Sequence, residues 1–110
     1  MRFRVVITDP ADRNFRDHFQ WIRQRSTQGA NAWRARIIEA VKSLEVSPER
    51  HPLARESAAF PVKIRCLLSG KNRSAFRILY QIKDNEVRVL AIRRPAQDLL
   101  DPEDLSEPES

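Results

Sequence analysis

Three short apolar runs constrain the fold of this 110-residue chain more strongly than any other feature. They span Val62–Leu68, Phe76–Ile82 and Val87–Ile92, and short clusters of turn-prone residues separate them. Runs of β-branched and aromatic residues that are bounded in this way are typical of strands joined by tight loops. The sequence therefore predicts a three-stranded antiparallel meander in this part of the chain.

The alternation of side chains along these runs predicts one apolar face of the sheet. Successive residues of a strand point to opposite faces, so every second residue shares a face. If Asp84 and Asn85 form the tip of the second hairpin, the expected opposite pairs are Ile82 with Val87, Tyr80 with Val89, and Ile78 with Ala91. The first run is expected to add Val62, Ile64, Cys66 and Leu68 to that face, which must then be buried.

The other face of the predicted sheet is expected to be basic. It collects Lys63, Arg65, Leu67, Arg77, Leu79, Gln81, Arg88, Leu90, Ile92 and Arg94, so it holds five cations and no carboxylate. Like charges on neighbouring strands repel one another, and an anionic ligand would relieve that repulsion. The alternative is a solvated face on which the long Lys and Arg stems cover the leucines.

The N-terminal half predicts one strand and two helices. Phe3–Thr8 alternates well enough for a strand, and Asp9–Pro10 suits the opening of a helix. Apolar residues at spacings of three and four predict an amphipathic helix that runs to about Arg25. A second stripe with Trp33 at its centre predicts another helix, which ends before Ser47.

These elements predict an α+β fold with an N-terminal strand, a helical hairpin and the meander, in which the helices pack on the apolar face of the sheet. The segment Ser47–Ala59 reads as a loop too polar for a core element. Residues 1–100 are expected to form one domain. Residues 101–110 are expected to form an acidic, flexible tail, because they are rich in acids and Pro.

The charge distribution favours an anionic partner. The net charge is +5, but six acids and no Lys or Arg follow Ala96, so removing those six negative charges leaves +11 on residues 1–95. A strongly basic body of this kind favours a polyanion or an acidic protein as partner. No apolar run reaches the length of a membrane span and no signal peptide is evident, so a cytoplasmic protein without a membrane partner is expected.

Cysteine and histidine usage predicts no covalent or metal chemistry. Cys66 is the single cysteine, so an intrachain disulfide is excluded, and a small core residue is expected there. His18 and His51 stand alone in the sequence, without the spacing of metal ligands. No metal site and no cofactor are therefore expected.

The chain resembles the RelE/ParE superfamily of bacterial toxins from type II toxin–antitoxin systems over about residues 3–100. The likeness is carried by the element order and by several ordered segments, namely Ala32-Trp33, Ser43-Leu44, Ser47-Pro48-Glu49-Arg50, Ile64-Arg65-Cys66-Leu67-Leu68, Phe76-Arg77-Ile78-Leu79-Tyr80 and Val87-Arg88-Val89-Leu90-Ala91-Ile92-Arg93. The resemblance implies a cytoplasmic toxin that a cognate acidic protein antitoxin neutralises. The implied target is either the ribosome with its mRNA or DNA gyrase.

In the RelE-like branch, basic residues of the sheet cleave mRNA on the ribosome. By position in the motif, Lys63, Arg65 and Arg77 match that catalytic set, with Lys63 as a candidate base and the arginines as phosphate ligands. Arg88 and Arg94 are expected to bind the substrate. A C-terminal tyrosine used by RelE-like enzymes is missing here, and Tyr80 is expected to point into the core.

Three functions follow as hypotheses. The first is an endoribonuclease toxin that cleaves mRNA on the ribosome, which the three matching basic residues favour slightly. The second is a ParE-like toxin that poisons DNA gyrase without being a nuclease. The third is a plain basic nucleic-acid-binding domain, although the chain has no recognised reading motif for that role.

Overall fold

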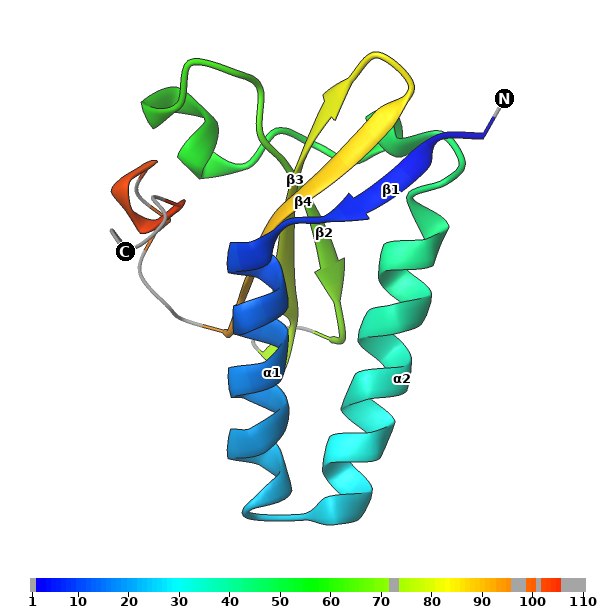
Figure 1. Cartoon of the computed structure of the whole chain (residues 1–110), viewed down its shortest axis with the longest axis vertical. Coiled ribbons are helices and arrows are strands. Elements are labelled where there is room, and N and C mark those ends of the chain that lie inside the picture. Colours follow the sequence, from blue (N-terminus) through cyan, green and yellow to red (C-terminus); the bar gives the residue numbers. More distant parts are fainter. Residues whose placement is uncertain (1, 72–73, 96–98, 101, 106–110) are drawn as a thin grey trace.

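The fold is a mixed four-stranded sheet with two helices packed on one face (Figure 1). The computed structural model describes residues 2–71, 74–95, 99–100 and 102–105. The elements in chain order are β1 (Arg4–Ile7), α1 (Asp9–Arg23), α2 (Thr27–Ser43), β2 (Arg65–Ser69), β3 (Phe76–Lys83) and β4 (Glu86–Arg93), and short 3-10 helices span Pro48–Arg50, Arg55–Ala59 and Pro102–Leu105. This order confirms the predicted α+β fold.

The strands lie in the order β1-β4-β3-β2. The antiparallel meander of β2, β3 and β4 is confirmed, and β1 joins its far edge by running parallel to β4. The sheet is therefore mixed, and its edge strand comes from the first residues of the chain. No helix of the described residues is long and apolar enough to cross a membrane.

The helical hairpin forms much as its pattern predicts. Helix α1 begins at Asp9, with Pro10 in its first turn, where the missing N–H of proline costs no hydrogen bond. Helix α2 begins earlier than the predicted apolar stripe, because the Oγ of Ser26 accepts the N–H of Gly29 at 2.9 Å and caps the helix. A short turn therefore joins the two helices.

The main hydrophobic core lies between the helices and the sheet. It is formed by Ala11, Trp33, Ile37, Leu44, Ile78, Tyr80, Val87, Val89 and Ile92. Trp33 is buried as predicted and contacts the rings of Phe15 and Phe76 at centroid distances of 5.2 and 5.3 Å. Tyr80 also lies in this core as predicted, and its hydroxyl donates to the carbonyl oxygen of Pro48 at 2.6 Å.

The predicted assignment of the β2 side chains to faces is wrong. Arg65 lies opposite Tyr80, and Leu68 lies opposite Arg77. Directly opposite residues of antiparallel strands share a face, so Arg65 is on the helix-covered face and Cys66 is on the other. The apolar pattern of β2 could not decide between the two alignments, because both faces of the sheet are partly buried.

A register shift in the β3–β4 pair changes the faces on which the last residues of β4 lie. Tyr80 pairs with Val89 as predicted, but Ile78 pairs with Ile92 instead of Ala91. The irregularity is held by α1, since the N–H of Ile92 donates to Oδ1 of Asn14 at 3.0 Å and its carbonyl accepts from Nε2 of His18 at 2.9 Å. Beyond the shift, Ile92 therefore faces the helices, contrary to the sequence prediction.

The second face of the sheet is not open, which corrects the prediction of a basic surface there. A second hydrophobic core lies on this face and is formed by Ala54, Ile64, Leu79, Ala91 and Leu100. Phe60, Cys66, Leu90 and Leu105 pack against this second core. The segment 47–59, predicted to be too polar for the core, contributes the buried residues Ala54 and Glu56. The chain after β4 supplies Leu100 and Leu105, while residues 101 and 106–110 of the predicted tail lie outside the described residues.

Candidate functional site

The structure divides the three predicted catalytic residues between two faces of the sheet. Arg65 begins β2 on the helix-covered face, where it lies opposite Tyr80. Arg77 lies opposite Leu68 and Arg93, on the other face. Lys63 precedes β2 and is exposed. The structure therefore does not bring these residues together on a single open surface.

Arg77 forms a two-pronged ion pair with Glu56. Its two terminal nitrogens donate to the two carboxylate oxygens at 2.7 and 2.5 Å. The side chain of Arg77 is 14% exposed and that of Glu56 is 0% exposed. The same carboxylate also accepts the N–H of Leu100 at 3.2 Å. Glu56 thus connects the sheet to the chain segment that follows β4.

The ionisation of Glu56 is set by these contacts. Burial on its own would raise the pKa of Glu56, because it disfavours the charged form. The hydrogen bonds from Arg77, from its own amide and from Leu100 outweigh that effect and leave the pKa of Glu56 below its usual value. The hydrogen bond to Glu56 likewise raises the pKa of Arg77. Both groups are therefore charged at neutral pH, and the guanidinium fork of Arg77 is already occupied by a carboxylate.

Arg65 fixes part of the segment that joins α2 to β2. Its Nη1 donates to the carbonyl oxygens of Glu49 and His51 at 3.1 and 2.7 Å. Its guanidinium therefore fixes the backbone around the 3-10 helix Pro48–Arg50. Beside Arg65, a shallow depression of about 570 Å³ is lined by Glu49, Val62, Lys63, Arg65, Gln81, Ile82 and Lys83.

The two predicted substrate-binding residues do not line that depression. Arg88 is exposed on β4, and its Nε donates to Oε1 of Glu86 at 2.8 Å. Arg94 is exposed immediately after the end of β4. Neither residue is among those that line the depression near Lys63.

Tyr80 is not placed to donate a proton to a leaving group. Burial raises the pKa of Tyr80 to about 12, and its hydroxyl hydrogen is used by the carbonyl of Pro48. Among the described residues there is also no group of His, Cys, Asp or Glu side chains that could hold a metal ion.

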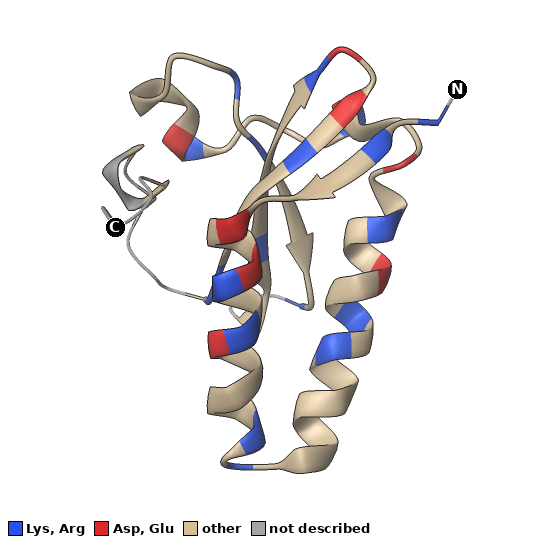
Figure 2. Ribbon diagram, viewed as in Figure 1, with Lys and Arg blue, Asp and Glu red and all other residues tan. Residues whose placement is uncertain are grey.

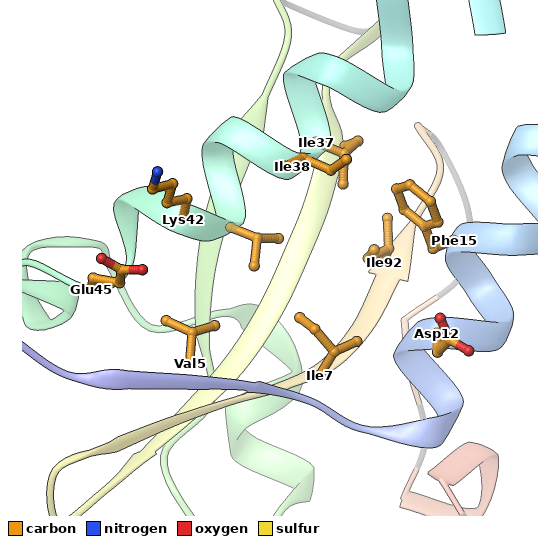
Figure 3. Close-up of a pocket in the computed structure, with 10 residues that line it drawn as sticks. Val5, Ile7, Asp12, Phe15, Ile37, Ile38, Lys42, Glu45 and Ile92 are labelled. Atoms are coloured by element: carbon orange, nitrogen blue, oxygen red, sulfur yellow. The ribbon is translucent and has the colours of Figure 1, made fainter. Parts of the chain in front are cut away.

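An apolar groove between β1 and the two helices was missed by the sequence reasoning (Figure 3). It has a volume of about 380 Å³ and is lined by Val5, Ile7, Asp12, Phe15, Ile37, Ile38, Val41, Lys42, Glu45 and Ile92. Two of its isoleucines are nearly half-exposed to solvent, with Ile7 43% and Ile38 46% exposed. The signal in the sequence was Ile38, an apolar residue that follows Ile37 but lies outside the stripe that covers the sheet.

Comparisons with known proteins found a matching family model and a solved structure of similar fold. A family model described as the ParE toxin of the type II toxin–antitoxin system parDE matches residues 5–99. A solved structure described as the chromosomal ParDE toxin–antitoxin system from P. aeruginosa is similar in fold, with a TM-score of 0.67 at 20% sequence identity. That likeness covers 86% of this chain and 97% of the other. No curated protein matches the sequence.

Proposed function

The chain belongs to the family of ParE toxins of type II toxin–antitoxin systems, and from this membership we propose that it inhibits DNA gyrase and does not cleave mRNA. Gyrase is the target that the superfamily resemblance implies for ParE-like members. Membership of this family therefore favours the hypothesis of a gyrase poison over that of an endoribonuclease. The arrangement of the basic residues supports the same choice.

The engagement of Arg77 by Glu56 is the observation that carries this proposal. Cleavage by a 2′-hydroxyl requires a base, a cation for the developing phosphorane charge and a proton donor around one phosphate. Arg77 is bound by a buried carboxylate, and Arg65 lies on the opposite face of the sheet. Lys63 and Arg65 both line one depression, but Arg77 is not among its lining residues, so the three residues do not surround one phosphate.

Two assays on the same toxin preparation test the proposal. We expect the purified toxin to inhibit supercoiling by gyrase while mRNA on programmed ribosomes stays intact. The combination of cleaved mRNA and unimpaired supercoiling would overturn the proposal and restore the ribonuclease hypothesis. An antitoxin-bound sample provides the control, because a genuine toxin effect should disappear on addition of the antitoxin.

We further propose that the antitoxin occupies the groove between β1 and the two helices. A groove with apolar walls and a few charged residues is suited to the apolar face of an amphipathic helix. The walls come from Ile7, Ile37 and Ile38, and Lys42 lies among the lining residues (Figure 3). The charge of +11 on residues 1–95 would attract an acidic partner and speed its association.

Ile38→Asp is expected to weaken antitoxin binding by at least about thirtyfold, as for a residue at the centre of an interface. Ile38 is half-exposed in the free toxin, so its free energy of unfolding should change by less than about 1 kcal/mol. Isothermal titration calorimetry with the purified antitoxin measures the effect. Leu68→Asp is the matched control, because Leu68 is 61% exposed on β2 and is not among the groove residues. Equal losses for both variants would contradict binding in the groove.

A further inference from the structure

Strand β3 extends past the beginning of β2 and leaves part of its own edge unpaired. Strand β2 begins at Arg65, which lies opposite Tyr80, whereas β3 continues to Lys83. The last residues of β3 therefore have β4 on one side and no strand of the described residues on the other. An unpaired strand edge carries backbone groups that can pair with another chain. The end of β3 therefore offers a short template for a further strand.

The backbone of Ile82 points to this open side. The N–H of Cys66 and the carbonyl oxygen of Ile64 bond to the preceding chain segment, so the N–H and C=O of Arg65 point toward β3. Tyr80 lies opposite Arg65, and its own N–H and C=O point back toward β2. The direction of these groups repeats at every second residue of a strand, so those of Ile82 point to the same side as those of Tyr80. No described residue forms a hydrogen bond with them.

The depression beside Arg65 includes this unpaired edge. It has a volume of about 570 Å³, and the last three residues of β3, 81–83, are among those that line it. Val62 and Lys63, from the segment that leads into β2, line it as well. Val62 is 40% exposed and Ile82 is half-buried, so the lining also offers apolar contacts. The depression thus combines two open backbone groups with an apolar contact surface.

The charge of the depression is positive. Lys63, Arg65 and Lys83 line it, and Glu49 is the one carboxylate among the lining residues that the structure describes. Figure 2 shows basic segments in the stretch that leads into β2 and at the end of β3. The acidic residues of the neighbouring turn between β3 and β4 are not among the lining residues. An excess of two cations favours an anionic partner at this place.

We propose that this depression binds an extended acidic segment of a protein partner, which adds to the edge of β3 at Ile82. The backbone of one partner residue would donate to the carbonyl oxygen of Ile82 and accept its N–H, as when a peptide adds to the edge of a sheet. Acidic side chains on either side of that residue would pair with Lys63 and Lys83. A nucleic-acid backbone fits less well, because a phosphate group cannot donate a hydrogen bond to the carbonyl oxygen of Ile82. The inference goes beyond the proposed function and does not depend on the target of the toxin.

A capped peptide of alternating Val and Glu, about eight residues long, tests this inference on the full chain. Isothermal titration calorimetry measures its Kd. Lys63→Gln/Lys83→Gln is expected to raise the Kd by about tenfold, because two surface ion pairs with the peptide are lost. Circular dichroism should show an unchanged fold, because both side chains are exposed.

Arg23→Gln/Arg34→Gln is the matched control. It removes the same charge from exposed positions on the two helices, and neither residue lines the depression. We expect it to change the Kd by less than about twofold, because charges farther from the peptide are screened by salt. Equal weakening by the two double variants would overturn the inference, since only net charge would then matter.

The backbone pairing is tested separately. A peptide methylated at every backbone nitrogen keeps its charges but cannot donate to the carbonyl oxygen of Ile82, so it should bind about tenfold more weakly. Binding of the unmethylated peptide should slow the solvent exchange of the Ile82 amide hydrogen, measured by nuclear magnetic resonance. The amide of Leu68 is the control, because it lies two residues after Cys66 and also points away from β3.

Three results would contradict this pairing. Equal affinity of the two peptides would show that the backbone takes no part in binding. Unchanged exchange at Ile82, or equal slowing at Ile82 and Leu68, would place the peptide elsewhere or at any free edge. A single-stranded nucleic acid that binds more tightly than the peptide, and that Lys63→Gln/Lys83→Gln weakens, would replace the acidic segment as the occupant and overturn the inference.

Discussion

Arg77→Ala is expected to reduce the free energy of unfolding by about 3–5 kcal/mol, the usual cost of leaving one partner of a buried ion pair alone. The variant leaves the carboxylate of Glu56 fully buried with the N–H of Leu100 but without its cation. Urea denaturation followed by circular dichroism measures the change. This expectation differs from that for an exposed catalytic arginine, whose removal would affect activity and hardly affect stability.

Two further variants test whether loss of the Arg77–Glu56 ion pair causes the expected decrease in the free energy of unfolding. Arg88→Ala removes an exposed arginine that pairs with Glu86 on the surface, and stability should stay close to that of the unmodified toxin. Replacing Glu56 and Arg77 together with Leu should recover much of the loss, because no buried charge then remains unpaired. If Arg77→Ala were no less stable than Arg88→Ala, the structural role assigned to Arg77 would be wrong.

Leu100→Ala is expected to cost about 2–5 kcal/mol of stability, the range for deleting a buried leucine side chain. Leu100 is 4% exposed and packs in the second core with Leu79 and Ala91. The adjacent Leu99→Ala is the control, since Leu99 is 47% exposed and should contribute little. Thermal and urea unfolding of both variants measure the difference, and equal midpoints would contradict the packing of this segment on the sheet.

The same segment changes the expectation for the end of the chain. The acidic composition of residues 101–110 predicts a tail that could be deleted without effect on stability. Leu105, however, is half-buried against the second core. Burying part of a leucine side chain contributes about 1 kcal/mol, so removal of residues 102–110 should lower stability measurably but less than Leu100→Ala.

The helix-facing half of the fold was predictable because its pattern has a single consistent period. Tyr80 and Val89 are separated by a short hairpin and lie directly opposite each other, so their shared face followed from the sequence. The apolar stripe around Trp33 in α2 could then be expected to pack on this apolar face of the sheet. By contrast, β2 has apolar residues on both faces, and a register shift near Leu79 depends on hydrogen bonds from α1 that lie far away in the sequence.

The surroundings of the candidate site residues were not predictable for a related reason. The basic residues were visible, but the partner of Arg77 is 21 positions away in a segment with a polar composition. Glu56 becomes buried only because the loop folds over the sheet, and hydrophobicity patterns give no sign of this. The groove beside Ile38 likewise requires β1 to be in place, and the sequence did not indicate which edge of the sheet that strand would join.

The parallel pairing of β1 with β4 has a consequence for synthesis of the toxin. Arg4 lies opposite Glu86 in the register. Strand β1 therefore cannot pair until β4 has been translated, more than eighty residues later. Contacts of such long range slow folding, because the entropy of closing the loop is lost before the contacts form. The groove proposed for the antitoxin contains residues of both strands, Ile7 and Ile92, so it is complete only after Ile92 has been translated. A nascent toxin would therefore lack the proposed antitoxin site until β4 has been made and has paired with β1.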